Sequence, residues 1–181
     1  MKAFYFKHIL NFHNPSGTSR GVLNQKESWF IIIYSDSKTG IGECSLIKGL
    51  SPDPENNYEQ TLKKVCDNIS DGFDNLSSRL NSYPSILFGL ETAFRSLESS
   101  DSVTLFSSEF TKNQDSIPIN GLIWMGQKKF MISQIKEKIN SGFDCVKIKI
   151  GSLDFDTEID LIKNIRKEYS LKDLEIRADA N

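Results

Sequence analysis

The pattern of apolar and polar positions changes part-way along the chain. Up to about residue 47, apolar residues alternate with polar ones or gather in aromatic and β-branched runs, which is typical of strands. The runs 2–12, 27–35 and 40–47 are separated by turn-forming residues at 14–21 and 36–40, so we expect an antiparallel three-stranded meander. Apolar residues then recur at helical spacing, which predicts a helix starting near residues 52–55 and another over 84–99.

The second half alternates between the two patterns. A short strand at 116–123 precedes a helix at 127–141, a strand at 145–151, a helix at about 154–169 and a strand at 174–181. The last helix is expected to bury an apolar stripe that includes Phe155 and Ile165. We therefore predict an α/β chain, with an α+β domain over 1–115 and, from 116, a parallel sheet that is either open or closed into a barrel.

Two of the predicted parallel strands are apolar on one face and charged on the other. In CVKIKIG, residues 145–151, Lys147 and Lys149 share one face, and LEIRADAN, residues 174–181, places Asp179 on its charged face. Parallel strands in an open sheet are covered by helices on both faces and are apolar on both. In a barrel the apolar faces meet the outer helices and the charged faces point inward. The pattern therefore favours a barrel, whose active site lies at the C-terminal strand ends.

The charged residues at these strand ends suggest a catalytic site. A single crossover helix joins the two strands, so they should be parallel neighbours, and Lys149 and Asp179 should converge on one mouth. Asp179 could bind a hard cation, and Lys149 could act as a base if neighbouring positive charge such as Lys147 lowers its pKa. Two alternatives remain open: an exposed edge strand protected by lysines, and a structural salt bridge between Asp179 and the lysines.

Composition and charge narrow the function classes. The formal net charge of −2 gives no electrostatic reason to expect nucleic acid or an anionic membrane as a partner, and no apolar run is long enough for a membrane span. The three cysteines, Cys44, Cys66 and Cys145, are widely spaced, and there are only two histidines. We therefore expect neither a zinc site nor a disulfide framework, but buried, inert thiols in a cytoplasmic protein.

Taken in order, the motifs resemble a known family. VKIKIG followed one crossover later by IRADAN resembles the enolase superfamily, in the branch that contains muconate lactonising enzyme, the dipeptide epimerases and o-succinylbenzoate synthase. GIGECSLIKGLSPD (40–53) and FGLETA (88–93) fit the same branch. IPINGLIWMG (117–126) is similar to the o-succinylbenzoate synthases of the menaquinone pathway. The resemblance runs over essentially the whole chain.

The resemblance implies a specific architecture and catalytic set. Residues 1–115 would form a capping domain, and residues 116–181 the first three β/α units of a modified (β/α)7β TIM-type barrel that is incomplete in this chain. Mg²⁺, with Mn²⁺ as an alternative, would lie at the barrel mouth with Asp179 as one ligand. Lys149 would remove the proton next to a carboxylate, and Lys147 would support it and keep its pKa low.

Three further residues are assigned to substrate by the same resemblance. Asn181 would sit beside Asp179, and the loops 14–22 and 47–53, the second containing Gly49, would close over the substrate. Arg20 would be available to an anionic group, although a solvated loop arginine is the default interpretation.

Three functions remain in competition. The first is a Mg-dependent o-succinylbenzoate synthase, which dehydrates a cyclohexadiene carboxylate. The second is a dipeptide epimerase or N-acylamino acid racemase, and the third is a non-catalytic α/β module. For the enzymes we expect a small-molecule carboxylate substrate and neither nucleic acid nor membrane, with no prediction of oligomeric state. A (β/α) barrel needs about 250 residues, so we expect a piece of a longer enzyme that is inactive alone.

Overall fold

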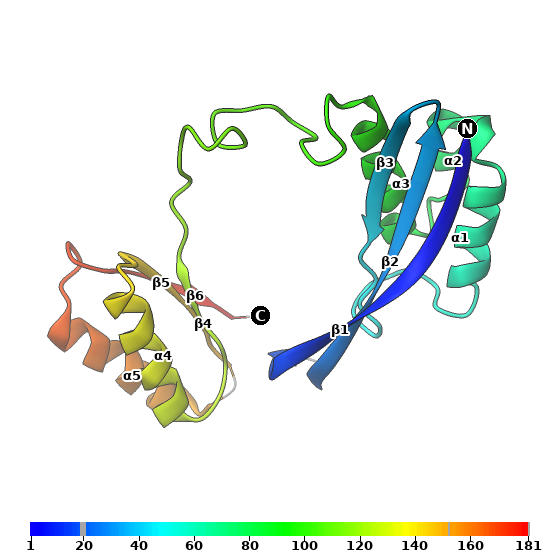
Figure 1. The fold of residues 1–181 in the computed structure, drawn as a ribbon. Helices are drawn as coiled ribbons and strands as arrows, with labels where there is room; N and C mark the ends of the chain where they lie inside the picture. Colours follow the sequence, from blue (N-terminus) through cyan, green and yellow to red (C-terminus); the bar gives the residue numbers. More distant parts are fainter. Residues whose placement is uncertain (19–20, 152, 181) are drawn as a thin grey trace. The chain divides into compact units, whose positions relative to one another are not determined.

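The computed structural model describes residues 1–18, 21–151 and 153–180 (Figure 1). The chain divides into two compact units, one of Met1–Pro15 with Asn24–Asp115 and one of Ser16–Leu23 with Ser116–Asn181. We call them the first and second units. Among the described residues, no helix combines the length and apolar character that a membrane crossing requires.

The first unit is built on a three-stranded sheet in the order β1-β2-β3. Its strands are β1 (Lys2–Thr18), β2 (Gly21–Ser35) and β3 (Lys38–Cys44). β2 and β3 are antiparallel and joined by a tight turn at Asp36, whose φ of 52° is left-handed. The predicted meander is therefore confirmed.

The strand bounds differ from the prediction, however. The loop expected at 14–21 is wrong for its described part, because β1 runs on to Thr18 and β2 begins at Gly21. Pro15 is tolerated inside β1 because β1 is an edge strand, where a missing N–H costs no ladder hydrogen bond. Strand pairing thus overrides the local turn preference.

Helices cover one face of this sheet and enclose the first core. They are α1 (Tyr58–Asp67), the 3-10 turn η1 (Ile69–Asp71), α2 (Phe73–Ser77) and α3 (Pro84–Glu98). Pro84 begins α3, as expected of a residue that needs no N–H in the first turn. Residues fully shielded in this core include Ile31, Ile33, Cys44, Leu62, Ile86, Leu90 and Ala93.

The first helix begins later than predicted. Residues 52–57 form turns, and α1 starts only at Tyr58. The reason lies at Asp53, which is buried and whose Oδ1 accepts hydrogen bonds from the backbone N–H of Ser85, at 3.0 Å, and from its hydroxyl, at 2.7 Å. Asp53, which was expected to begin the first helix, thus bonds to the first turn of α3 instead.

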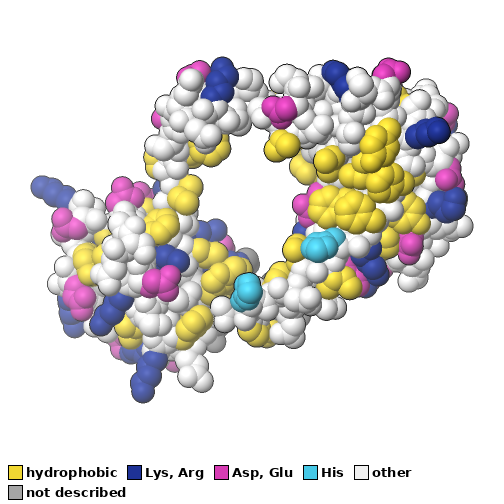
Figure 2. All heavy atoms as spheres, in the orientation of Figure 1, with side chains coloured by type: hydrophobic (Ala, Val, Ile, Leu, Met, Phe, Trp, Pro, Cys, Tyr) yellow, Lys and Arg dark blue, Asp and Glu magenta, His cyan; other side chains and the backbone are white. Residues whose placement is uncertain are grey.

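The other face of the sheet carries aromatic residues. Phe6 stacks on Phe30 with ring centroids 5.2 Å apart, and Phe4 stacks on Tyr34 at 5.8 Å. Figure 2 shows hydrophobic side chains gathered on this unit. Phe4, Phe6 and Tyr34 each keep more than two fifths of their surface exposed.

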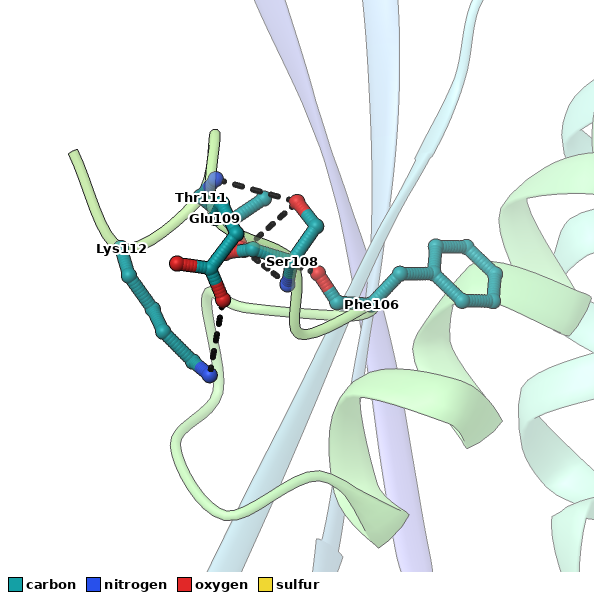
Figure 3. Close-up of polar contacts among 5 residues, drawn as sticks. All are labelled: Phe106, Ser108, Glu109, Thr111 and Lys112. Atoms are coloured by element: carbon teal, nitrogen blue, oxygen red, sulfur yellow. Dashed lines mark hydrogen bonds and ion pairs between the residues drawn. The ribbon is translucent and has the colours of Figure 1, made fainter. Parts of the chain in front are cut away.

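The part of the first unit that follows α3 contains a locally bonded turn (Figure 3). The N–H of Ser108 donates to Thr111 Oγ1 at 2.8 Å, and the N–H of Thr111 donates back to Ser108 Oγ at 3.1 Å. Thr111 Oγ1 also donates to the carbonyl of Phe106. Reciprocal side-chain bonds of this kind hold a turn without a packed core.

The second unit alternates strands and helices. β4 (Gly121–Ile123), α4 (Lys128–Asn140), β5 (Cys145–Lys149), α5 (Phe155–Glu168) and β6 (Glu175–Asp179) follow one another, and the strands form a parallel sheet in the order β4-β5-β6. The predicted order is confirmed, although β4 begins at Gly121 and not at residue 116. α4 and α5 lie on the same side of the sheet (Figure 1).

The predicted apolar stripe of α5 is confirmed at Ile165 but is wrong at Phe155. Ile165 is buried against the sheet together with Leu161, whereas Phe155 is 74% exposed. Glu158 shares this buried face because its carboxylate accepts hydrogen bonds from the preceding loop. The buried face of α5 therefore includes a charged residue, Glu158, which an apolar pattern does not predict.

Candidate active site

The second sheet has one apolar and one charged face, as predicted. The apolar face packs under α4 and α5, and its buried core consists of Ile123, Met131, Ile135, Val146, Ile148, Leu161, Ile165 and Leu174. Because side chains alternate along a strand, Lys147 and Lys149 lie on the opposite face. Both helices are therefore on the side away from the lysines.

Strand register brings the predicted catalytic residues together. Lys147 lies opposite Arg177, and Lys149 lies opposite Asp179, at the carboxyl ends of β5 and β6. β5 is the central strand of the three. The alternative of an exposed edge strand with protective lysines is therefore wrong.

The two lysines have different partners. Lys147 Nζ lies 2.8 Å from Asp179 Oδ2, diagonally across the two strands, and the side chains keep 37% and 28% of their surface exposed. The salt bridge considered from the sequence is thus present between Lys147 and Asp179. Lys149 Nζ lies over the indole of Trp124, 6.0 Å from the ring centroid, which is within the range of a cation–π contact.

Trp124 was not singled out from the sequence, and neither was the residue that holds it. Trp124 follows β4 directly, and its backbone N–H and C=O both bond to the side-chain amide of Gln134 on α4, each at 3.0 Å. Trp124 could have been found from its spacing, since it lies two residues after Leu122, which is opposite Lys147. Gln134 carries no comparable signal within its helix.

The loop after β5 is held by a buried carboxylate. Glu158 accepts from the N–H of Gly151 at 2.8 Å and from the N–H of Leu153 at 3.0 Å. Gly151 has a φ of 98°, which favours glycine. The N–H of Ile150 donates to the carbonyl of Asp179, so the strand ends stay joined beyond the last pair.

A thiol shares the charged face of β5. Cys145 is buried two residues before Lys147, and burial raises the pKa of its thiol. It therefore stays protonated at neutral pH and adds no negative charge beside the lysines.

Comparison with known proteins relates this arrangement to a family. The chain is 37% identical to o-succinylbenzoate synthase of Desulfotalea psychrophila, over all of this chain and 58% of that protein. The crystal structure of MenC from Desulfotalea psychrophila superposes with a TM-score of 0.78 at 32% identity, over all of this chain and 57% of that one.

In sequence and in fold, the chain is thus similar to o-succinylbenzoate synthases. A Thermosynechococcus elongatus o-succinylbenzoate synthase, complexed with Mg in its active site, shares the fold with a TM-score of 0.75 at 16% identity, over all of this chain and 52% of that one. Dipeptide epimerases share it as well. By this likeness of fold, the first unit corresponds to a capping domain and the second to part of a (β/α) barrel. No family model matches the chain.

The chain spans less than two thirds of the length of the relatives it matches. Within the described residues, no group of three or more His, Cys, Asp or Glu side chains is placed to hold a metal ion. Asp179 supplies a carboxylate of the kind that Mg²⁺ binds.

Of the remaining predicted site residues, the structure describes Gly49 alone. Arg20 and Asn181 lie outside the described residues. Gly49 lies in a turn of the capping domain with a φ of 72°, and its N–H donates to Glu55 Oε1 at 3.0 Å. The hydroxyl of Ser51 accepts from the N–H of Ile47 at 2.9 Å, so the 47–53 loop has internal hydrogen bonds at several points.

Proposed function

We propose that this chain is part of an o-succinylbenzoate synthase of menaquinone biosynthesis, with Lys149 as the base. The observation that carries the proposal is the register of β5 and β6, which sets Lys149 opposite Asp179 at the carboxyl ends of parallel strands. That is where barrels of this kind place their active sites. The similarity of the whole chain to an o-succinylbenzoate synthase supports the choice of reaction.

The reaction needs one proton removed and one hydroxyl expelled. In 2-succinyl-6-hydroxy-2,4-cyclohexadiene-1-carboxylate, the neutral amine of Lys149 would take the proton from the carbon that bears the carboxylate. The hydroxyl on the neighbouring carbon leaves as water, and the new double bond completes the benzene ring. In a syn elimination the hydroxyl departs on the face of the base, so the ammonium formed on Lys149 is placed to protonate it.

The other charged residues, Asp179 and Lys147, would bind the metal and position its ligand. Removing a proton next to a carboxylate creates a second negative charge, which bound Mg²⁺ would offset. Asp179 would be one ligand, and the remaining ligands would come from barrel strands beyond β6. Lys147, paired with Asp179 at 2.8 Å, would hold that carboxylate in place and add positive charge beside Lys149.

The test is made on a polypeptide that carries this chain together with the strands that close the barrel, which we call the complete enzyme. Lys149→Ala should lower the rate of dehydration at least about a thousandfold, because the base is removed. Lys163→Ala, at an exposed position on α5, is the matched control and should keep full activity. Chelation of divalent metal should abolish the activity of the unaltered enzyme, and added Mg²⁺ should restore it.

Four outcomes contradict the proposal in different ways. Dehydration that survives in Lys149→Ala rules out the base, and indifference to the chelator rules out the metal. Epimerisation of a dipeptide without dehydration would establish the alternative within the superfamily. A folded complete enzyme inactive on both substrates would favour the third interpretation, in which Lys147 and Asp179 form a structural ion pair.

A further inference from the structure

Both polar atoms of the Gln134 side-chain amide bond to the backbone of one residue, Trp124. Its Oε1 accepts from the N–H of Trp124 and its Nε2 donates to the C=O of Trp124, both at 3.0 Å. Gln134 is 9% exposed, so these bonds lie largely out of water, where an unpaired amide would be costly. The two bonds together fix the peptide on both sides of Trp124.

Gln134 bonds to Trp124 at the point where the hydrogen-bonded ladder between β4 and β5 ends. The last pair between β4 and β5 is Ile123 with Ile148, so the backbone of Trp124 has no ladder partner. Gln134 satisfies the N–H and C=O that the missing partner would have bonded. The direction of the indole is therefore set by α4, through Gln134, and not by the neighbouring strand.

The indole in turn limits where the amine of Lys149 can lie. Trp124 is 39% exposed, and Lys149 Nζ lies 6.0 Å from its ring centroid. A flexible lysine loses few of its rotamers on an open surface, but an aromatic face attracts its ammonium and fills the space on one side. Lys147 is instead directed to Asp179.

We propose that Gln134 and Trp124 are positioning residues for Lys149: Gln134 fixes the backbone of Trp124, and the indole holds the amine of Lys149 at the barrel mouth. This proposal rests on the proposed function, in which Lys149 is the base. Positioning acts on the chemical step, because displacement of a reacting group by about 1 Å can cost about a hundredfold in rate.

The contact itself can be tested without measuring activity. The complete enzyme is labelled with 5-fluorotryptophan, and the fluorine resonance that disappears in Trp124→Phe is assigned to Trp124. Lys149→Met, which keeps the length of the chain and removes the charge, should shift that resonance and leave the one from Trp29 in place. Lys163→Met is the matched control and should shift neither. A Trp124 resonance that does not move in Lys149→Met overturns the proposal.

Kinetics test the consequence for the reaction. Trp124→Leu and Gln134→Met should each lower kcat about tenfold while KM stays within about twofold, because substrate binding is not the step affected. Trp124→Phe keeps an aromatic face and should recover part of the loss, which a purely structural role would not predict. Ser133→Ala, an exposed neighbour of Gln134, should be unaffected.

The two proposals fail in distinguishable ways. If Lys149→Ala is inactive but Trp124→Leu keeps its kcat, the positioning role is wrong and the proposed function stands. If Lys149→Ala keeps dehydration, the proposed base is wrong, and the positioning role falls with it whatever the fluorine spectrum shows. Should Gln134→Met not fold, the half-exposed Trp124 variants decide the question.

Discussion

Glu43 shows how a single side chain in the capping domain couples stability to pH. Its Oε1 accepts from the hydroxyl of Ser28 at 2.7 Å and from Lys26 Nζ at 3.0 Å, and Ser28 is completely buried. These bonds, led by the one from Ser28, hold the pKa of Glu43 below its usual value. A carboxyl with a lowered pKa stabilises the fold above its unfolded pKa, about 4.3, and the contribution is lost as the pH falls through the folded pKa.

Ser28→Ala should therefore destabilise the protein at neutral pH but not in acid. We expect a loss of at most about 1 kcal/mol at pH 7, because the Glu43 side chain is 42% exposed and solvent weakens the interaction. The difference from the unaltered protein should fade as the pH drops below about 4. Urea unfolding at both pH values measures it, with Ser45→Ala as an exposed control. An equal loss at both pH values would contradict the assigned cause.

At the same scale, the sequence predicted some site residues and missed others for a physical reason. The faces of Lys147, Lys149 and Asp179 follow from the two-residue period of a strand, which needs no knowledge of the rest of the fold. Gln134 and Glu158 lie on helices, and their side chains bond to the backbone of a strand end and of a loop. Such contacts depend on how a helix is rotated and placed on the sheet, which its sequence does not determine alone.

Among the secondary-structure elements, the closest packing in the capping domain is between β3 and α3. A Cβ atom at Gly42 would overlap the carbonyl oxygen of Gly89, and one at Gly89 would overlap the sulfur of Cys44. The helix and strand approach through their backbones at this point, which only glycine permits. The apolar periodicity predicted both elements, but the choice of glycine is explained only by their contact.

Gly42→Ala should destabilise the capping domain by about 1–3 kcal/mol, because the added methyl group has no space and α3 must move away. Gly17→Ala is the control, since nothing lies within 4 Å of the added atom and its φ needs no glycine. Thermal unfolding followed by circular dichroism measures both. A neutral Gly42→Ala would mean that the two backbones are farther apart than described.

Considered whole, the chain holds two separate cores, one under the capping-domain sheet and one between the partial barrel and its helices. The change of periodicity along the sequence predicted this succession, because a meander with helices and a run of β/α units bury their apolar residues differently. The lengths of β1 and β2 were not predictable, since pairing between strands outweighs the turn preference of residues such as Pro15 and Gly17.

The three buried cysteines can report local opening of the two cores. Burial raises the pKa of Cys66 to about 11 and raises those of Cys44 and Cys145 as well, so thiolate is scarce at neutral pH and the sulfurs are covered. An alkylating reagent can reach each one only when its surroundings open. Labelling rates therefore measure the free energy of opening, with two probes in the first unit and one in the second.

Mass spectrometry of labelled peptides should then show Cys44 and Cys66 reacting together and Cys145 at its own rate. Gly42→Ala should speed labelling of the first two by the factor that its loss of stability predicts, about tenfold for each 1.4 kcal/mol, and leave Cys145 unchanged. Acceleration at all three sites would show that the two cores open as one. The cysteines, which have no role in the proposed reaction, would thus show whether the capping domain and the partial barrel unfold independently.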